Sequence, residues 1–228
     1  MQLLVSPSSI DEARHSAAAD IIDVKRPSEG SLGANFPWVI REIKAFAKKP
    51  VSAAIGDFPY KPGGAALAAY GAACAGADYV KIGLAFQGKG HARDVIEAVV
   101  KAVKDEFPDK YVVIAGYSDY QRMNSISPFD IAPLAAAGGA DLAMIDTGIK
   151  DGMSTFAFMD EETLRRFTEK NRELGLGTAL AGSLKFEDID VLKRINPDVI
   201  GVRGMVCGGD RNATIREDLI RTALARIR

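Results

Sequence analysis

Short apolar runs alternate with longer segments of helical spacing along the whole chain. The apolar runs predict strands that begin near Gln2, Asp20, Val51, Asp78, Tyr111, Asp141, Gly177 and Asp198. The segments between them predict helices at 10–19, 37–47, 64–75, 92–106, 128–137, 161–174, 186–195 and 214–227. A regular alternation of strand and helix is typical of a parallel sheet that is covered by helices.

Eight such units within 228 residues predict a single-domain (β/α)8 TIM barrel over residues 1–228. An open doubly wound sheet built from the same elements is the alternative. Three helix-to-strand joints repeat a small residue followed by an aspartate, at Asp20, Asp78 and Asp141. This near-repeat of the unit favours the barrel.

Composition limits the partners and the compartment that we expect for the protein. A net charge of −1 gives no general attraction to nucleic acid or to an anionic membrane. Two cysteines, Cys74 and Cys207, are too few for a disulfide framework or a zinc site. No apolar stretch reaches the roughly 18 residues that span a bilayer, and the first residues lack the pattern of a signal peptide. We expect a cytoplasmic protein without a nucleic-acid or membrane partner.

Three predicted strands end in charged residues. Asp23 and Lys25 lie at the end of the second strand, Lys81 on the fourth, and Asp146 on the sixth, with Lys150 following. Residues two apart in a strand point to the same side, so Asp23 and Lys25 share a face. Alternate strands of a barrel contribute to one layer of inward side chains. We therefore expect these five residues to converge at the C-terminal mouth.

Clustered lysines disfavour one another's charge, which lowers the pKa of at least one of them. A partly neutral lysine is a nucleophile for carbonyl carbon, and nearby carboxylates can accept and return protons. The predicted cluster thus favours imine chemistry. An internal salt-bridge network without a catalytic role is the alternative.

A second group of residues follows the seventh and eighth strands, where barrels commonly bind phosphate. The candidate phosphate-binding residues are Gly182, Ser183, Arg203, Gly204, Gly208, Gly209 and Asp210. Glycines let backbone N–H groups approach a phosphate closely, and Arg203 or Arg211 could add a bidentate contact. Glycine-rich turns without a ligand are the alternative. No spacing of histidine, cysteine or carboxylate residues indicates a metal site, and we expect no cofactor.

On these residues the chain resembles the (5-formylfuran-3-yl)methyl phosphate synthase family over nearly its whole length. The likeness lies in LLVSP at 3–7, IIDVK at 21–25, GSLGANFPW at 30–38, GDFPYKPG at 56–63, GADYVKIG at 76–83, DTGIKDG at 146–152, AGSLK at 181–185, GVRG at 201–204 and GGDR at 208–211.

The resemblance implies a (β/α)8 barrel that condenses two glyceraldehyde 3-phosphate molecules with loss of phosphate and water. The implied product is a furan precursor of methanofuran-type cofactors. Its Schiff-base lysine falls on Lys25, and its supporting residues fall on Asp23, Lys81, Asp146 and Lys150. The implied lyase is metal-independent, its partner is a triose phosphate, and we expect a homo-oligomer.

Two other functions remain open from the residues. One is another class I aldolase or isomerase acting on a sugar phosphate. The other is a phosphate-ligand-binding barrel that does no catalysis.

Overall fold

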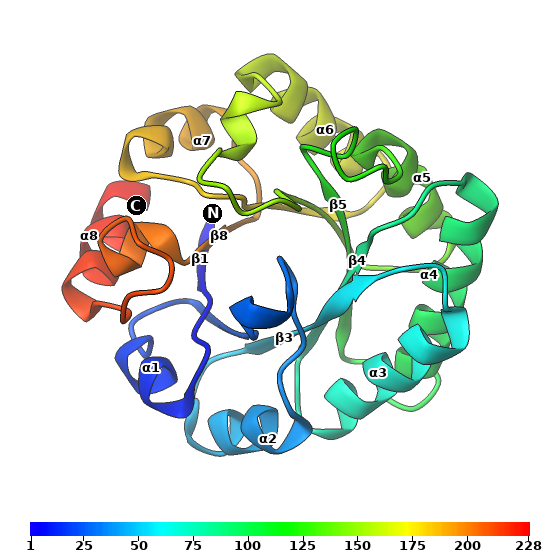
Figure 1. Ribbon diagram of the computed structural model, residues 1–228, viewed down its shortest axis with the longest axis horizontal. Helices are drawn as coiled ribbons and strands as arrows, with labels where there is room; N and C mark the ends of the chain where they lie inside the picture. The colour runs from blue at the N-terminus through cyan, green and yellow to red at the C-terminus, as the bar shows by residue number, and fades with distance from the viewer.

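Eight parallel strands close into a barrel in the order β1 to β8, in a computed structural model that describes residues 1–228 (Figure 1). The barrel closes where β8 pairs with β1, with Gln2 opposite Val199 and Val5 opposite Val202. This closure confirms the predicted (β/α)8 barrel and excludes the open doubly wound sheet.

The strands are β1 (Gln2–Val5), β2 (Ile21–Val24), β3 (Val51–Phe58), β4 (Tyr79–Leu84), β5 (Tyr111–Tyr117), β6 (Leu142–Asp146), β7 (Gly177–Leu180) and β8 (Val199–Val202). The α-helices are α1 (Ile10–His15), α2 (Pro37–Phe46), α3 (Pro62–Cys74), α4 (Lys89–Lys104), α5 (Pro128–Ala137), α6 (Glu161–Glu173), α7 (Ile189–Ile195) and α8 (Glu217–Ile227). Four short 3₁₀ helices lie in the connections: η1 (Pro27–Glu29), η2 (Thr155–Ala157), η3 (Phe186–Asp188) and η4 (Gly204–Cys207).

The strands read as continuous apolar runs because both of their faces are buried. One face packs against the helices, as Leu3 and Val5 of β1 do in the large core. The other face fills the barrel with a smaller cluster that includes Leu4, Val113 and Met144. Each strand is therefore packed on both faces, and the barrel holds its inward-facing side chains rigidly.

The surrounding helices pack one apolar face against the barrel. In α4 the buried residues follow the spacing of one helical face: Ala92, Val95, Ile96, Val99, Val100 and Val103. No helix is both long and apolar enough to span a membrane.

Element starts match the prediction closely, with a few shifts. The strands predicted from Asp20, Asp78, Asp141 and Asp198 each begin one residue later. The last helix begins at Glu217 rather than at 214, and the one predicted over 186–195 starts as a 3₁₀ turn. The first helix ends at His15, where Ser16 donates its hydroxyl to the carbonyl oxygen of Glu12.

The four aspartates before the even-numbered strands make one repeated contact. Each donates its backbone N–H to a carbonyl of the preceding odd-numbered strand, and its carboxylate accepts the N–H of that same residue. The pairs are Asp20 with Leu3, Asp78 with Val51, Asp141 with Val112, and Asp198 with Thr178. The contact joins β1 to β2, β3 to β4, β5 to β6, and β7 to β8 at their N-terminal ends. We call it the aspartate clamp.

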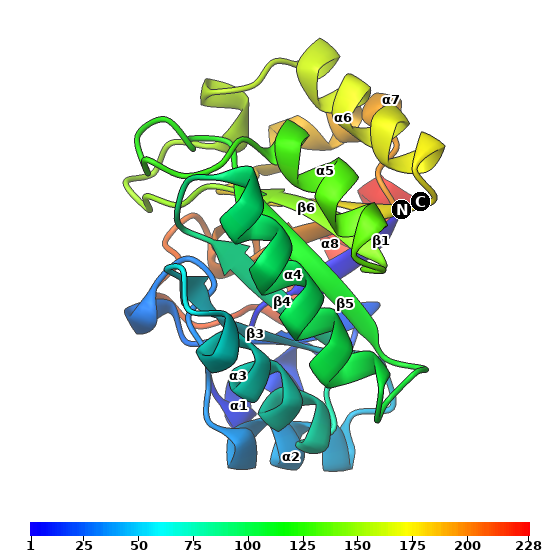
Figure 2. The same ribbon diagram turned by 90° about the vertical axis from the view of Figure 1, so that its right-hand side faces the viewer.

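The two faces of the barrel differ in their connections. The chain termini lie together at one end, and the longer loops gather at the opposite end (Figure 2). That end is the C-terminal face of the strands, where the segment with η1 lies over the barrel mouth (Figure 1). Lys25, Lys150 and the glycine loops follow strand C-terminal ends, whereas Asp23, Lys81 and Asp146 lie within β2, β4 and β6.

Candidate active site

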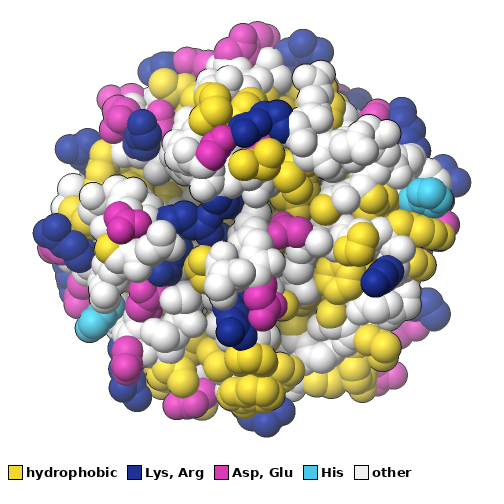
Figure 3. Space-filling model, in the orientation of Figure 1, with side chains coloured by type: hydrophobic (Ala, Val, Ile, Leu, Met, Phe, Trp, Pro, Cys, Tyr) yellow, Lys and Arg dark blue, Asp and Glu magenta, His cyan; other side chains and the backbone are white.

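A cavity of about 610 Å³ lies at the mouth of the barrel. Its lining includes four of the five predicted catalytic residues, Lys25, Lys81, Asp146 and Lys150, together with the loops after β7 and β8. Lysine and arginine side chains outnumber aspartate and glutamate in this lining, and Figure 3 shows them gathered in a hollow near the centre of the face. The cavity therefore favours an anionic ligand.

Lys25 follows the last residue of β2 and is buried, with 7% of its surface exposed. Its Nζ donates to the carbonyl oxygen of Ser31 at 3.3 Å. Burial lowers the pKa of Lys25 to about 8; the nearby Asp146 opposes this shift, whereas Lys150 and Lys81 add to it. The amine is therefore far more often neutral at physiological pH than that of an ordinary lysine.

Asp23 and Lys81 form a buried ion pair beside Lys25. Lys81 Nζ lies 2.8 Å from Asp23 Oδ2, which also accepts from the Ser6 hydroxyl at 2.9 Å. Burial alone would raise the pKa of Asp23, but the charges of Lys81 and Lys25 hold it below its ordinary value. Asp23 is not among the residues that line the cavity. Both of its hydrogen-bond partners, Lys81 and Ser6, do line the cavity.

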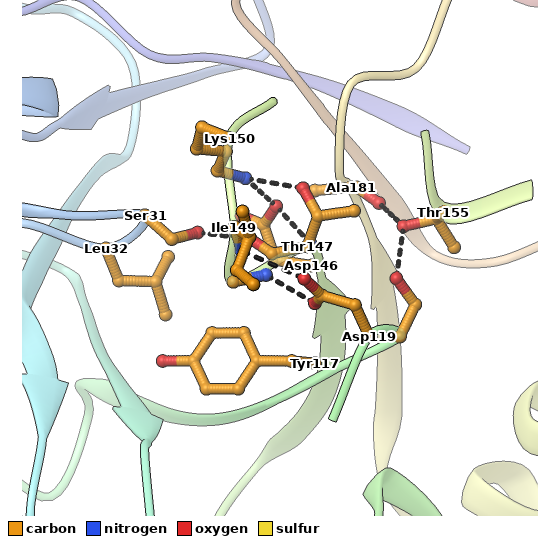
Figure 4. A network of polar contacts seen from close by, with 12 residues as sticks. Ser31, Leu32, Tyr117, Asp119, Asp146, Thr147, Ile149, Lys150, Thr155 and Ala181 are labelled. Atoms are coloured by element: carbon orange, nitrogen blue, oxygen red, sulfur yellow. Dashed lines mark hydrogen bonds and ion pairs between the residues drawn. The ribbon is translucent and has the colours of Figure 1, made fainter. Parts of the chain in front are cut away.

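Asp146 and Lys150 form a second ion pair on the cavity wall. Lys150 Nζ lies 2.6 Å from Asp146 Oδ1 and 2.9 Å from Thr147 Oγ1 (Figure 4). Burial would raise the pKa of Asp146, but Lys150 and Lys25 keep it below its ordinary value. The structure thus brings all five predicted residues together, as two lysine–carboxylate pairs around Lys25. Their chemical roles remain predictions.

Asp119 holds the loop that carries Lys150. Its carboxylate accepts the N–H of Gly148 at 2.6 Å and that of Ile149 at 2.9 Å (Figure 4). Asp119 follows β5 and is itself buried. The sequence prediction missed this residue, because a single aspartate in a long loop carries no spacing signal.

Thr155 fixes the other end of the same loop. Its hydroxyl donates to the carbonyl oxygen of Ala181 at 2.6 Å, and its N–H donates to that of Gly182 at 2.9 Å (Figure 4). The loop after β6 is thus joined to the glycine loop after β7.

Gly182 and Ser183 have positive φ angles of 99° and 51°. A Cβ atom at Gly182 would lie 2.3 Å from Thr155 Oγ1, so only glycine fits there. The backbone N–H groups of Gly182, Ser183 and Gly204 donate to no protein acceptor. Free N–H groups at the cavity wall are suited to binding phosphate oxygens.

The two arginines of the loop after β8 differ in their contacts. The Arg203 guanidinium is buried and fully engaged, with Glu12 on two nitrogens and the carbonyl oxygens of Ser6 and Arg211. Arg211 lines the cavity and makes no ion pair. Asp210 accepts the N–H of Asn212. All the residues predicted to bind phosphate line the cavity, Arg203 and Asp210 included. Arg203 and Asp210 also make contacts within the protein, whereas the Arg211 guanidinium is left for a ligand.

No group of three histidine, cysteine, aspartate or glutamate residues is placed to hold a metal ion. Both cysteines are free thiols, Cys74 exposed and Cys207 buried.

Comparison with known proteins identifies relatives across the full length. The family model described as 4-HFC-P synthase matches residues 3–224. The (5-formylfuran-3-yl)methyl phosphate synthase of Methanosarcina mazei is 58% identical, covering 99% of this chain and 98% of its own. The synthase of Archaeoglobus fulgidus is 51% identical, covering 96% of each chain. Among solved structures, KGPDC from Streptococcus mutans has a TM-score of 0.70 at 16% identity, covering 99% of this chain and 96% of its own.

The barrel, its lysine-centred cavity and its named relatives define a (β/α)8-barrel enzyme that forms a furan phosphate. The chain belongs to the 4-HFC-P synthase family, a family of methanofuran biosynthesis. This membership confirms the resemblance found in the sequence motifs.

Proposed function

We propose that the chain condenses two molecules of glyceraldehyde 3-phosphate into (5-formylfuran-3-yl)methyl phosphate through an imine on Lys25. The observation that carries the proposal is a buried amine with a pKa of about 8 at an anion-binding cavity. At pH 7 about one tenth of such amines are neutral, against fewer than about one in a thousand for an ordinary lysine. Family membership supports the product.

The reaction begins when neutral Lys25 Nζ adds to the aldehyde carbon of the first triose phosphate. Loss of water gives the imine, which accepts the electron pair left when a proton is removed from the adjacent carbon. That carbon attacks the aldehyde of the second molecule. Cyclisation and elimination then release the product, and the overall balance is one phosphate and two waters lost.

In this proposal the two ion pairs have different roles in the reaction. Asp146 and Lys150 line the cavity, so they exchange protons with the carbonyl oxygen and the reacting carbons. Asp23 orients Lys81 and acts through it, since its own carboxylate lies outside the lining. Together with Lys150, Lys81 keeps positive charge beside Lys25 and favours its neutral form.

Phosphate contacts hold the substrates in register, which converts a collision of two molecules into an oriented step. The free N–H groups of Gly182, Ser183 and Gly204 provide one cradle. Gly208 and Gly209, with φ of 75° and 101°, let the loop after β8 turn around it. Arg211 supplies a cation that no carboxylate of the protein neutralises.

Incubation with glyceraldehyde 3-phosphate alone, followed by mass spectrometry of the product, tests the proposal. A furan aldehyde phosphate supports it, and a simple aldol or isomer would instead identify another class I aldolase or isomerase. Binding without any turnover would leave a phosphate-binding barrel. In this proposal the imine stabilises the carbanion, so activity survives exhaustive chelation; loss that added divalent metal restores would contradict this part.

The proposed setting is the cytoplasm, which the two free thiols support because unpaired cysteines are usual in reducing compartments. The proposed assembly is a homo-oligomer. The outer face of α3 supports it, since this helix has no charged residue and exposes Leu67 by 76% and Tyr70 by 43%. Light scattering of the purified protein measures the mass directly, and a monomer would reject the assembly.

A further inference from the structure

One peptide group at the barrel mouth contacts both Lys25 and the half-buried carboxylate of Asp57. Its carbonyl, that of Ser31, accepts from Lys25 Nζ at 3.3 Å. Its N–H, that of Leu32, donates to Asp57 Oδ2 at 3.0 Å and to Oδ1 at 3.2 Å. The peptide bond is planar and trans, so its carbonyl and its N–H point in opposite directions within one rigid plane. Holding the N–H therefore fixes the direction of the carbonyl.

Asp57 is itself held by Tyr117. The Tyr117 hydroxyl donates to Asp57 Oδ1 at 2.5 Å, and the Tyr117 side chain is completely buried. Burial and the nearby Asp57 raise the pKa of Tyr117 well above its ordinary value, so the phenol remains a donor. In Figure 4 the hydroxyl end of Tyr117 points toward Leu32.

Two glycines leave the space that this arrangement occupies. A Cβ atom at Gly30 would lie 2.2 Å from Asp57 Oδ2, and one at Gly83 would lie 2.1 Å from the Tyr117 hydroxyl oxygen. Neither Asp57 nor Tyr117 lines the cavity. The contacts of the pair lead instead to the peptide group beside Lys25.

We infer that Asp57 and Tyr117 are positioning residues for Lys25, acting through the Ser31–Leu32 peptide group. The Ser31 carbonyl takes one N–H of the amine, and the lone pair of the neutral amine is left for the cavity. A second contact anchors the same segment, since the Ser31 hydroxyl donates to the carbonyl oxygen of Thr147 at 2.7 Å. This inference rests on the proposed role of Lys25 as the nucleophile.

Rapid mixing with glyceraldehyde 3-phosphate, followed by borohydride reduction at increasing times, measures both the rate and the end point of imine formation. Tyr117→Phe keeps the ring and removes only the donor, and Asp57→Asn keeps the shape and removes the charge. Tyr79→Phe is the matched control, because Tyr79 stacks on Tyr111 at the start of β4, at the other end of the barrel.

The expected result is an unchanged end point on Lys25 with a rate constant reduced by about tenfold in both variants and unchanged in Tyr79→Phe. Wild-type rates in Tyr117→Phe and Asp57→Asn would overturn the inference. So would a reduced end point with an unchanged rate, which indicates only a smaller folded fraction. If the wild-type protein forms no adduct on Lys25, the proposed function fails and this inference fails with it. Should Asp57→Asn not fold, Tyr117→Phe decides alone.

Discussion

Replacing Lys150 with methionine tests whether this residue sets the protonation of Lys25. Lys150 Nζ lies 2.6 Å from Asp146 Oδ1, and its charge helps to lower the pKa of Lys25. In Lys150→Met the buried Asp146 carboxylate loses its partner and attracts the Lys25 amine instead. Both changes favour the ammonium form, so the pKa of Lys25 must rise.

The size of the effect follows from the titration of Lys25. With a pKa of about 8, about one tenth of the amine is neutral at pH 7. A rise of about one unit reduces this fraction about tenfold. Imine formation at pH 7 should slow by about the same factor and recover near pH 10, where both proteins are largely neutral at Lys25.

The assay is the rate of borohydride-trapped imine on Lys25 at a series of pH values from about 6 to 10. Lys150→Arg is the control, because it keeps a cation within reach of Asp146 and should keep the wild-type midpoint. A Lys150→Met profile that is lowered equally at every pH, with an unmoved midpoint, would refute the reasoning. The proton transfer proposed for Lys150, and not the effect of its charge on Lys25, would then set the rate of imine formation.

Three further predictions address Lys25, Arg203 and Gly182. The lowered pKa of Lys25 means that the unfolded state binds more protons between about pH 8 and 10.5, so the wild-type free energy of unfolding should rise with pH across that window relative to Lys25→Met. At pH 7, Lys25→Met should be inactive, yet its free energy of unfolding in urea should be higher by about 1–2 kcal/mol. The gain is smaller than the full pKa shift implies because Asp146 loses a nearby cation. A less stable variant would contradict the argument that burial lowers the pKa of Lys25. Arg203→Met should lower the free energy of unfolding by about 2 kcal/mol, because it leaves the nearly buried Glu12 without its cation, and an unchanged urea midpoint would show that this pair does not stabilise the fold. Gly182→Ala forces a strained backbone against Thr155, so calorimetry with inorganic phosphate should show binding weakened about tenfold or more; wild-type affinity would remove the loop after β7 from the phosphate site.

The fold was predictable because its signals are local and repeated. Each strand is an apolar run, and four of them start directly after an aspartate that the sequence shows at regular joints. Pro37 and Pro128 mark helix starts that the structure places at the same residues. Boundaries failed where a local contact decides them, as at Ser16 after the first helix.

The convergence of the lysines was predictable for a different reason. Alternation along a strand and membership of even strands fix which way a side chain points, so the sequence alone predicts where Lys81 and Asp146 lie. The supports of the site could not be placed this way. Asp119 and Tyr117 act on loops more than 25 residues away in the chain, and no periodicity relates them to the groups that they hold.

The aspartate clamp joins the strands of the barrel in pairs. A division of the chain between two of these pairs also divides the residues of the proposed active site. A cut in the connection between Lys104 and Tyr111 leaves two clamps in each half, those of Asp20 and Asp78 before it and those of Asp141 and Asp198 after it. Lys25 and Lys81 belong to the first half, whereas the glycine cradle belongs entirely to the second. Each half retains its own clamps, but neither carries both the proposed nucleophile, Lys25, and the proposed phosphate site. Two co-expressed fragments divided there would regain turnover only by pairing β4 with β5 and β8 with β1, so catalysis itself would report the reassembly of the barrel.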